Sequence, residues 1–408
     1  TNPDSYDSAD TAVLVDINNV DNTVTLLNLD LGKRYTLSMD GTTRFADKYG
    51  KAISLSQLQE GDIVDVTFLK SQKHLTSMQL AQTAWQYEDV EHYEMNTVRN
   101  EVAIGEEVFQ LSRDTQYFSQ GHSIEKMDLN PADILTFHGI DSTVLSVTVE
   151  KGHGYLRLVN DENFVGGWLE IGQTQIVRIT EDMLVTVPEG SYQVDISYNG
   201  GGGTKNVVIN RNEETTLDIG DLEVAEAQYG MVLFSMSPAD AELYIDGSQV
   251  DPSQPVSLEY GIHQIIAKAD GYKSLTQYLR VGQESAGVDV QLDKVDSDSE
   301  ESTGSTQSSS SAGSSSTGTA SGSTSATADT TTTYYRVHID APENVEVYLD
   351  GNYVGISPCS FKKTSGSHVI TLRKSGYETR SYTVQVDDEQ KDVSYSFVDL
   401  TVSSQTSK

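Results

Sequence analysis

The chain has little cysteine and few basic residues, and each shortage excludes a class of protein. Cys359 is the only cysteine in 408 residues, which excludes an intramolecular disulfide and a cysteine-rich zinc site. Lysine and arginine total 27 against 61 aspartates and glutamates, a formal net charge of −34. Because phosphate binding needs a basic surface, no nucleic acid is expected as a partner. Direct attraction to an anionic lipid surface is not expected either.

Long apolar runs are also missing. No segment approaches the roughly 18 to 20 apolar residues that span a bilayer, and no signal peptide is recognisable. The sequence opens at Thr1 with a small, polar run, and residues 1–10 are interpreted as a stalk. We therefore expect membrane contact only through an anchor upstream of Thr1; an arbitrary start of the sequence is the alternative.

A low-complexity segment divides the chain near its C-terminal end. Residues 295–333 are almost entirely serine, threonine, glycine and alanine, with no aromatic residue, lysine or arginine. Such a composition cannot bury enough apolar surface to offset the entropy of ordering it. We predict a disordered Ser/Thr/Gly linker that acts as a spacer.

One repeat occupies the N-terminal part, with an offset near 70 residues. Its copies share a short strand, an aromatic residue and a turn that ends in aspartate and isoleucine. These landmarks are Tyr35–Ser38, Phe45 and Gly61-Asp62-Ile63 in one copy, and Phe109–Ser112, Phe118 and Ala132-Asp133-Ile134 in the other. Apolar residues alternate with polar ones between turn-forming runs, which predicts half-buried strands. Leu55–Leu58 is expected to form one helical turn. Each copy resembles small SH3-like or OB-like β-barrels of exported bacterial proteins.

A second repeat starts near Tyr155. Its last two copies keep a proline, an Asp-Gly pair, a Gly-x-His triplet and a Gly-Tyr pair in the same order. These are Pro238, Asp246-Gly247, Gly261-x-His263 and Gly271-Tyr272, then Pro342, Asp350-Gly351, Gly366-x-His368 and Gly376-Tyr377. Asp-Gly between alternating strands predicts two-residue hairpin turns, whose central residues need positive φ. The copies share turn residues and apolar alternation and vary their exposed polar residues, which indicates a scaffold.

These residues resemble the PEGA domain, a small β-sandwich-like module of bacterial and archaeal envelope proteins. The Pro-Glu-Gly-Ala run that names the family is altered in both copies, to Pro238-Ala-Asp-Ala241 and Pro342-Glu-Asn-Val345. An earlier copy, Tyr155–Leu222, is degenerate: Tyr192 replaces the histidine, and Ile171-Gly172 stands where the others have Asp-Gly. The resemblance implies association with the cell envelope and fixes no ligand.

The predicted fold is all-β and multi-domain, with two small SH3/OB-like β-barrels followed by three small β-sandwich-like PEGA modules. The predicted segments are a polar stalk (1–10), barrel 1 (11–83), barrel 2 (84–152), a degenerate PEGA-like module 1 (153–223), PEGA-like module 2 (228–294), the linker (295–333), PEGA-like module 3 (334–399) and a tail (400–408).

No catalytic, cofactor-binding or metal-binding residues are predicted. No two histidines have a metal-ligand spacing, and no phosphate loop, Rossmann fingerprint or nucleophile elbow is present. His263 and His368 occupy equivalent positions at the start of a strand and are interpreted as structural. Cys359 is interpreted as a buried, inert thiol. The chain is therefore expected not to be an enzyme and to need no cofactor.

The function expected from these observations is a non-enzymatic scaffold on the bacterial surface, extracellular and anchored by a segment upstream of Thr1. Its partner would be a cell-wall polymer, an S-layer or another protein. One alternative is a carbohydrate-binding array that stacks sugars on Trp85, Tyr87 or Trp168. Another is the accessory or sensory ectodomain of a larger membrane protein whose active part precedes Thr1.

Overall fold

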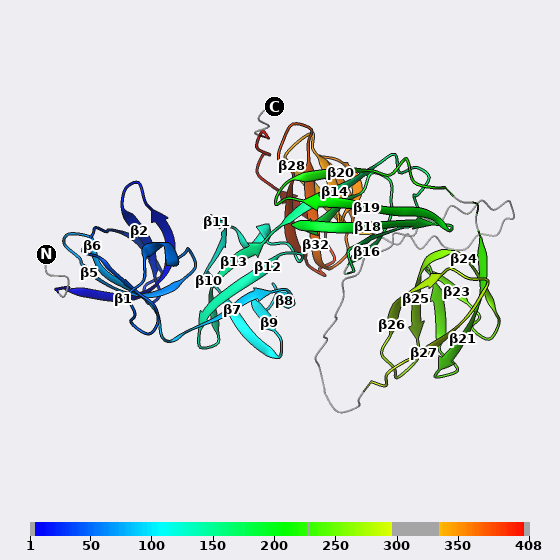
Figure 1. Cartoon of the computed structure of the whole chain (residues 1–408), viewed down its shortest axis with the longest axis horizontal. Coiled ribbons are helices and arrows are strands. Elements are labelled where there is room, and N and C mark those ends of the chain that lie inside the picture. The colour runs from blue at the N-terminus through cyan, green and yellow to red at the C-terminus, as the bar shows by residue number, and fades with distance from the viewer. Residues whose placement is uncertain (1–4, 174, 225, 227, 296–333, 404–408) are drawn as a thin grey trace.

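The computed structural model describes residues 5–173, 175–224, 226, 228–295 and 334–403. Within them, all regular structure is β except for two single-turn 3-10 helices. Eight sheets are arranged along the chain as successive small units (Figure 1). The predicted class, all-β and multi-domain, is confirmed. The predicted linker lies outside the described residues except for Val295.

Barrel 1 is one six-stranded sheet that closes on itself. Its elements are β1 (Ser8–Asn18), β2 (Thr23–Asn28), β3 (Lys33–Ser38), β4 (Arg44–Ala46), η1 (Leu55–Gln57), β5 (Ile63–Leu69) and β6 (His74–Leu80). The strand order is β3-β2-β1-β5-β6-β4, and pairing of Ser38 with His74 joins β3 to β6. Strand β1 starts at Ser8 and pairs with Phe68, so the prediction of a polar stalk up to residue 10 is wrong for Ser8–Asp10.

Barrel 2 has the same plan with its strands divided differently. Its elements are β7 (Ala84–Val90), β8 (Tyr93–Asn96), β9 (Glu101–Ile104), β10 (Glu107–Ser119), β11 (His122–Ile124), η2 (Lys126–Asp128), β12 (Ile134–Ile140) and β13 (Thr143–Lys151). The order is β7-β12-β13-β10-β9-β8. The two end strands follow each other in the chain, separated by Glu91 and His92, so the backbone itself completes the ring. The predicted helical turn is confirmed as η1, and η2 stands at the matching place.

The next three units share one topology, a three-stranded sheet packed on a four-stranded sheet. Module 1 contains β14 (His153–Val159), β15 (Trp168–Ile171), β16 (Gln175–Arg178), β17 (Leu184–Pro188), β18 (Gly190–Tyr198), β19 (Gly201–Ile209) and β20 (Glu214–Asp218). Module 2 contains β21 (Tyr229–Ser237), β22 (Glu242–Ile245), β23 (Ser248–Val250), β24 (Val256–Glu259), β25 (Gly261–Lys268), β26 (Leu275–Val281) and β27 (Ser285–Gln291). Module 3 contains β28 (Arg336–Ala341), β29 (Glu346–Leu349), β30 (Asn352–Ile356), β31 (Cys359–Lys362), β32 (Gly366–Arg373), β33 (Arg380–Val386) and β34 (Val393–Ser396).

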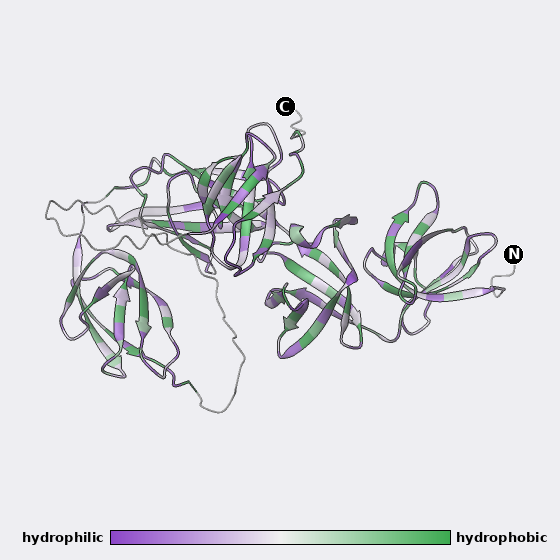
Figure 2. Cartoon of the chain, turned by 180° about the vertical axis from the view of Figure 1, so that it is seen from behind, coloured by the Kyte–Doolittle hydropathy of each residue, from purple (hydrophilic) through white to green (hydrophobic). Residues whose placement is uncertain are grey.

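In each of these modules the first strand is central to the three-stranded sheet and runs parallel to the last strand. Apolar side chains at alternate positions face the other sheet and form a separate core for each module. Figure 2 shows this alternation as green and purple bands along the strands. The core of module 3 includes Leu400, and the Ser403 amide bonds the Gly376 carbonyl. The predicted tail therefore starts inside the folded unit.

The hairpin turns form as their residues predict. Both residues of Asp246-Gly247 and of Asp350-Gly351 have positive φ, between 49° and 87°, a conformation that aspartate and glycine tolerate. In module 1 the strand register places Gly172, not Ile171, at the position of the aspartate, also with positive φ. Module 1 therefore keeps a positive φ at this first turn position, although its turn joins Ile171 to Gln175 and is one residue longer than those of modules 2 and 3.

Candidate functional site: the junctions between modules

Two equivalent aspartates lie at the first junctions of the chain. Asp62 precedes β5 and Asp133 precedes β12, and each is buried. In each, Oδ2 accepts the backbone N–H three residues earlier, from Gln59 at 2.9 Å and from Asn130 at 2.8 Å. This local turn leaves Oδ1 facing a histidine of the unit that follows. The repeated Asp-Ile landmark of the sequence thus marks a contact between successive units.

The first junction is apolar apart from a few buried polar groups. Asp62 Oδ1 lies 3.6 Å from His138 Nε2 of barrel 2, and the Ser146 hydroxyl donates to the Gly61 carbonyl. Burial raises the pKa of Asp62 to about 6 and lowers the pKa of His138 to about 4. Burial therefore disfavours the charged form of each side chain. Around them, a cluster from both barrels packs Val13, Val15, Leu27, Ile63, Ala81 and Phe118.

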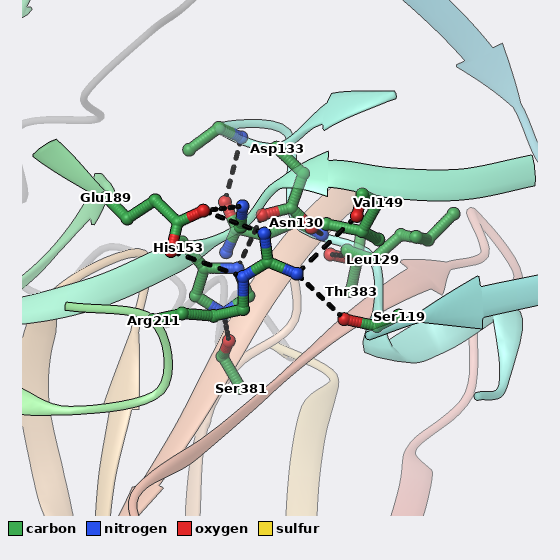
Figure 3. A network of polar contacts seen from close by, with 12 residues as sticks. Ser119, Leu129, Asn130, Asp133, Val149, His153, Glu189, Arg211, Ser381 and Thr383 are labelled. Carbon is green, nitrogen blue, oxygen red and sulfur yellow. Dashed lines mark hydrogen bonds and ion pairs between the residues drawn. The ribbon is translucent and has the colours of Figure 1, made fainter. Parts of the chain in front are cut away.

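The second junction contains a chain of hydrogen bonds through three units. His153 of module 1 contacts Asp133 Oδ1 of barrel 2 through Nδ1 at 2.6 Å, and Ser381 Oγ of module 3 through Nε2 at 3.0 Å. The Tyr155 hydroxyl donates to the same Ser381 oxygen at 3.0 Å. From this network we assign the proton of a neutral ring to Nδ1. Each member then has a partner, and Figure 3 shows Asp133, His153 and Ser381 close to one another.

An arginine clamps module 1 to barrel 2 beside this chain. Arg211 forms a bidentate pair with Glu189, with its shorter contact 2.7 Å, and donates to the Ser119 hydroxyl of barrel 2 (Figure 3). It also donates to the Glu150 carbonyl of barrel 2. The Arg211 hydrogen bonds hold the pKa of Glu189 below its usual range. Gly152 permits this approach, since a Cβ there would lie 2.7 Å from Arg211 Nε.

Module 3 docks on both of the earlier units, although module 2 and the linker precede it in the chain. Towards barrel 2, Thr383 donates to the Leu129 carbonyl at 2.6 Å, and Arg380 pairs with Asp128 at 3.1 Å. Towards module 1, Arg373 bridges its own Glu346 and Glu214 of module 1, at 2.7 Å each. In Figure 1 module 3 lies against β14 and β20.

An apolar contact completes this interface. Tyr348 of module 3 packs with Tyr155 and Leu184 of module 1, and each of the three is 1% exposed. The Leu184 amide donates to the Gly351 carbonyl in the hairpin turn of module 3. A buried aromatic anchor with polar contacts around it is the arrangement expected of a specific interface.

Asp133, His153 and Ser381 have the order and contacts of a Ser-His-Asp triad, which raises the question of catalysis. A catalytic serine needs a substrate atom about 3 Å away. Here the three side chains are 2% to 7% exposed, and the serine oxygen already accepts from Tyr155. They also come from three different units, so any opening that admitted a substrate would separate Ser381 from His153.

Sequence-derived candidates for sugar stacking are engaged in packing. Trp168 is 6% exposed, with Arg178 and Tyr278 against its ring. Trp85 packs on Phe109, and a Cβ at Gly139 would lie 2.2 Å from its ring. Tyr87 bonds Glu107 and contacts Trp85. Trp168 is therefore not an open stacking platform, because its own Arg178 and Tyr278 of module 2 cover its ring, whereas Trp85 is half-buried against Phe109.

The described part of the chain offers little for a metal ion or a membrane. There, no group of three or more His, Cys, Asp or Glu side chains is placed to hold a metal ion. Across the same residues, no helix is long and apolar enough to cross a membrane. Burial raises the pKa of the Cys359 thiol, which disfavours the reactive thiolate.

Comparisons with known proteins support one part of this organisation. The model of the PEGA domain family matches residues 335–399, so the C-terminal unit is a PEGA domain. No curated protein sequence matches the chain. Among solved structures, the TIE protein of Bacillus anthracis is 12% identical, with TM-score 0.18, 97% of this chain covered and 69% of that chain.

Two further structures share even less with the chain. The major pilin subunit BcpA of Bacillus cereus is 8% identical, with TM-score 0.12 over 62% of this chain and 100% of the pilin. A Ca²⁺-stabilised, ice-binding adhesin of an Antarctic bacterium is 10% identical, with TM-score 0.09 over 95% of this chain and 91% of the adhesin. Scores this low carry no structural argument.

Sequence reasoning missed the junctions. Asp62 and Asp133 were visible as repeat landmarks, but their histidine partners come from other units. Ser381 lies 228 positions from His153. The one available signal was the repetition of an aspartate at a fixed place before a strand.

Proposed function

We propose that the chain is a non-enzymatic scaffold exposed on a bacterial surface, where it holds an envelope polymer or a protein partner. The observation that supports this most is the second junction, where a buried Asp133–His153–Ser381 chain joins three units. In this proposal, the aspartate, histidine and serine serve to hold the units together. The PEGA domain at residues 335–399 supports an envelope setting.

We further propose that modules 1 and 2 are divergent PEGA modules. They repeat the strand order of module 3. Module 2 also repeats its His-Asp contact, 2.6 Å between His263 and Asp246 and 2.7 Å between His368 and Asp350. The covered ring of Trp168 weighs against the carbohydrate-binding alternative.

Binding is tested by incubating the purified chain with peptidoglycan, isolated wall polymer and S-layer protein, followed by sedimentation of the complexes. We expect one of the three to retain the chain and a charge-matched acidic protein to stay in solution. If none of the three retains the chain, the proposed holding role is wrong.

The non-enzymatic character needs its own test. Wild type and the Ser381→Ala variant are compared for hydrolysis of activated esters and of peptide libraries. We expect neither to exceed the uncatalysed rate. Turnover by wild type that disappears in Ser381→Ala would instead establish a serine hydrolase.

A further inference from the structure

The docking of module 3 defines two kinds of surface on these modules. Face A is the outer side of the three-stranded sheet, and face B is the outer side of the four-stranded sheet. In the observed interface, face A of module 1 contributes Tyr155, and face B of module 3 contributes Tyr348 and Arg373. The contact is therefore heterologous, A against B.

Module 2 has a face A with no partner among the described residues. The first three outward side chains of β21 are Tyr229, Met231 and Leu233, which are 56%, 45% and 56% exposed, and the next is Ser235. Inward residues of the same strand are buried in the core. Outward positions of a sheet that faces water are usually polar, so three successive apolar side chains form an unusual stripe.

The other modules show what this stripe corresponds to. The strand register aligns Met231 with Tyr155 of module 1, where the ring is covered by docking, because each is the first residue of its strand to pair with the last strand. In module 3 the outward residues of β28 are the polar Arg336, His338 and Asp340. Of the three A faces, one is docked, one is polar and exposed, and that of module 2 is apolar and exposed.

On its own face B, module 2 has residues equivalent to those with which module 3 contacts module 1. Tyr244, Gly247 and Lys268 match Tyr348, Gly351 and Arg373 by register and turn position. Tyr244 donates to Glu242 as Tyr348 donates to Glu346. The Tyr244 side chain is only half-buried, under its own Lys268, and a Cβ on Gly247 would have no neighbour within 4 Å.

The rest of this face is already used within the chain. Tyr278 packs on Trp168 of module 1, and Arg280 pairs with Glu170 at 2.6 Å. The contacts leave Tyr244 and Lys268 at the open side. Charge is complementary too, because Glu259 lies beside Tyr229 on face A while Lys268 lies on face B.

We propose that face A of module 2 binds face B of module 2 in a second copy of this chain. The occupant is a second copy because module 2 carries both halves of such a contact. Its face A has the apolar stripe, and its face B has the matching residues without a partner module in the described part of the chain. A heterologous contact of this kind does not close on itself in a pair, so it continues from copy to copy. This inference does not depend on the proposed surface role, since it follows from the repeated geometry.

The test measures self-association of the full 408-residue chain by sedimentation velocity. Protein concentrations extend up to about 1 mM, so that weak binding is also detected. We expect concentration-dependent growth beyond a dimer in wild type. Leu233→Glu on face A, and Tyr244→Ala with Lys268→Glu on face B, should each weaken association at least about tenfold. Val208→Glu, at a valine of β19 that is 58% exposed, is the matched control and should associate like wild type.

Mixing the variants gives the sharpest readout. The face A variant keeps an intact face B and the face B variant keeps an intact face A, so an equimolar mixture should form pairs that do not grow. Circular dichroism shows whether each variant remains folded. A monomeric wild type, or growth unaffected by Leu233→Glu, overturns the proposal. Growth that survives both variants but is lost in Arg373→Glu would overturn it in favour of exchange of module 3 between copies.

Discussion

Nδ1 of His263 lies 2.6 Å from Oδ2 of Asp246, while Nε2 of the same ring lies 2.7 Å from the Glu259 carbonyl. Both neighbours can only accept hydrogen bonds, so the ring is held as an imidazolium. Burial opposes the charge, but these hydrogen bonds prevail and raise the pKa of His263 above its ordinary value. The Asp350 hydrogen bond does the same for the pKa of His368.

A pH dependence of module 2 follows from this pair. Because the folded pKa of His263 is raised, its stabilisation is complete below the unfolded pKa, about 6.5, and is lost as pH rises through the folded pKa. We expect hydrogen exchange of module 2 amides to quicken, relative to the intrinsic rate, across that window. In His263→Gln this change should disappear. A ring titration by NMR that gave an ordinary or lowered pKa for His263 would contradict the assignment.

At Asp62 we expect the opposite effect: removing its charge should stabilise the folded barrels. Since burial raises its pKa to about 6, folding is disfavoured progressively as pH rises from about 4 to 6 and remains so above. Asp62→Asn keeps the acceptor for the Gln59 amide and cannot ionise. We expect the barrels to gain about 1–2 kcal/mol at pH 8 and nothing at pH 4, as measured by urea unfolding.

The equivalent aspartate of barrel 2 is the control for Asp62. Asp133→Asn replaces a carboxylate that contacts His153 at 2.6 Å, so we expect it to destabilise at pH 8. If both variants moved the urea midpoint in the same direction, the difference between the two junctions would be refuted.

The His153 ring fastens the second junction. In His153→Ala, Asp133 stays buried without its partner, which should weaken docking of module 3 by about 3 kcal/mol. A fluorescent donor on barrel 2 and an acceptor on module 3 would report the loss as lower transfer efficiency. His338→Ala should leave the transfer unchanged, because its contact with Asp392 lies on the exposed side of module 3. Equal transfer in wild type and His153→Ala would refute this role.

The apolar anchor can be tested independently of charge. Tyr348 is outside the core of its own module, so Tyr348→Ala should cost about 3 kcal/mol of docking while module 3 still folds. Tyr244→Ala removes the equivalent ring of module 2 and should leave that docking intact. Protection of Leu184 and Tyr155 amides from hydrogen exchange distinguishes the two, and it should fall only in Tyr348→Ala.

Much of the fold could be predicted because it is set locally. Asp246-Gly247 and Asp350-Gly351 specify their turns whatever surrounds them, and Leu55–Gln57 forms the expected helical turn. The sequence alignment of module 1 with the other modules was wrong by one residue at this turn. Because module 1 lacks the aspartate, its Gly172 was matched to the glycine at the second position of the turn instead of to the aspartate at the first. The register shows that Gly172 and Tyr192 replace the aspartate and histidine together, with a Cβ at Gly172 3.4 Å from the ring.

The contacts between units could not be predicted, because alternation tells which side chains face out but not what covers them. Tyr348 and Tyr244 read alike in sequence, yet one is 1% exposed and the other half-buried. Trp168 was misjudged for the same reason, since Tyr278, which covers it, belongs to another module. Only the packing of one unit on another distinguishes these positions.

The return of module 3 to barrel 2 and module 1 also determines how the chain would carry tension. A pull applied between barrel 1 and module 3 passes directly through the Arg373–Glu214 and Ser381–His153 contacts. Module 2 lies outside this path, so it bears no load until that interface parts. Under tension this interface would break first. Its rupture would let module 3 move away from barrel 2 and module 1 while every module stays folded.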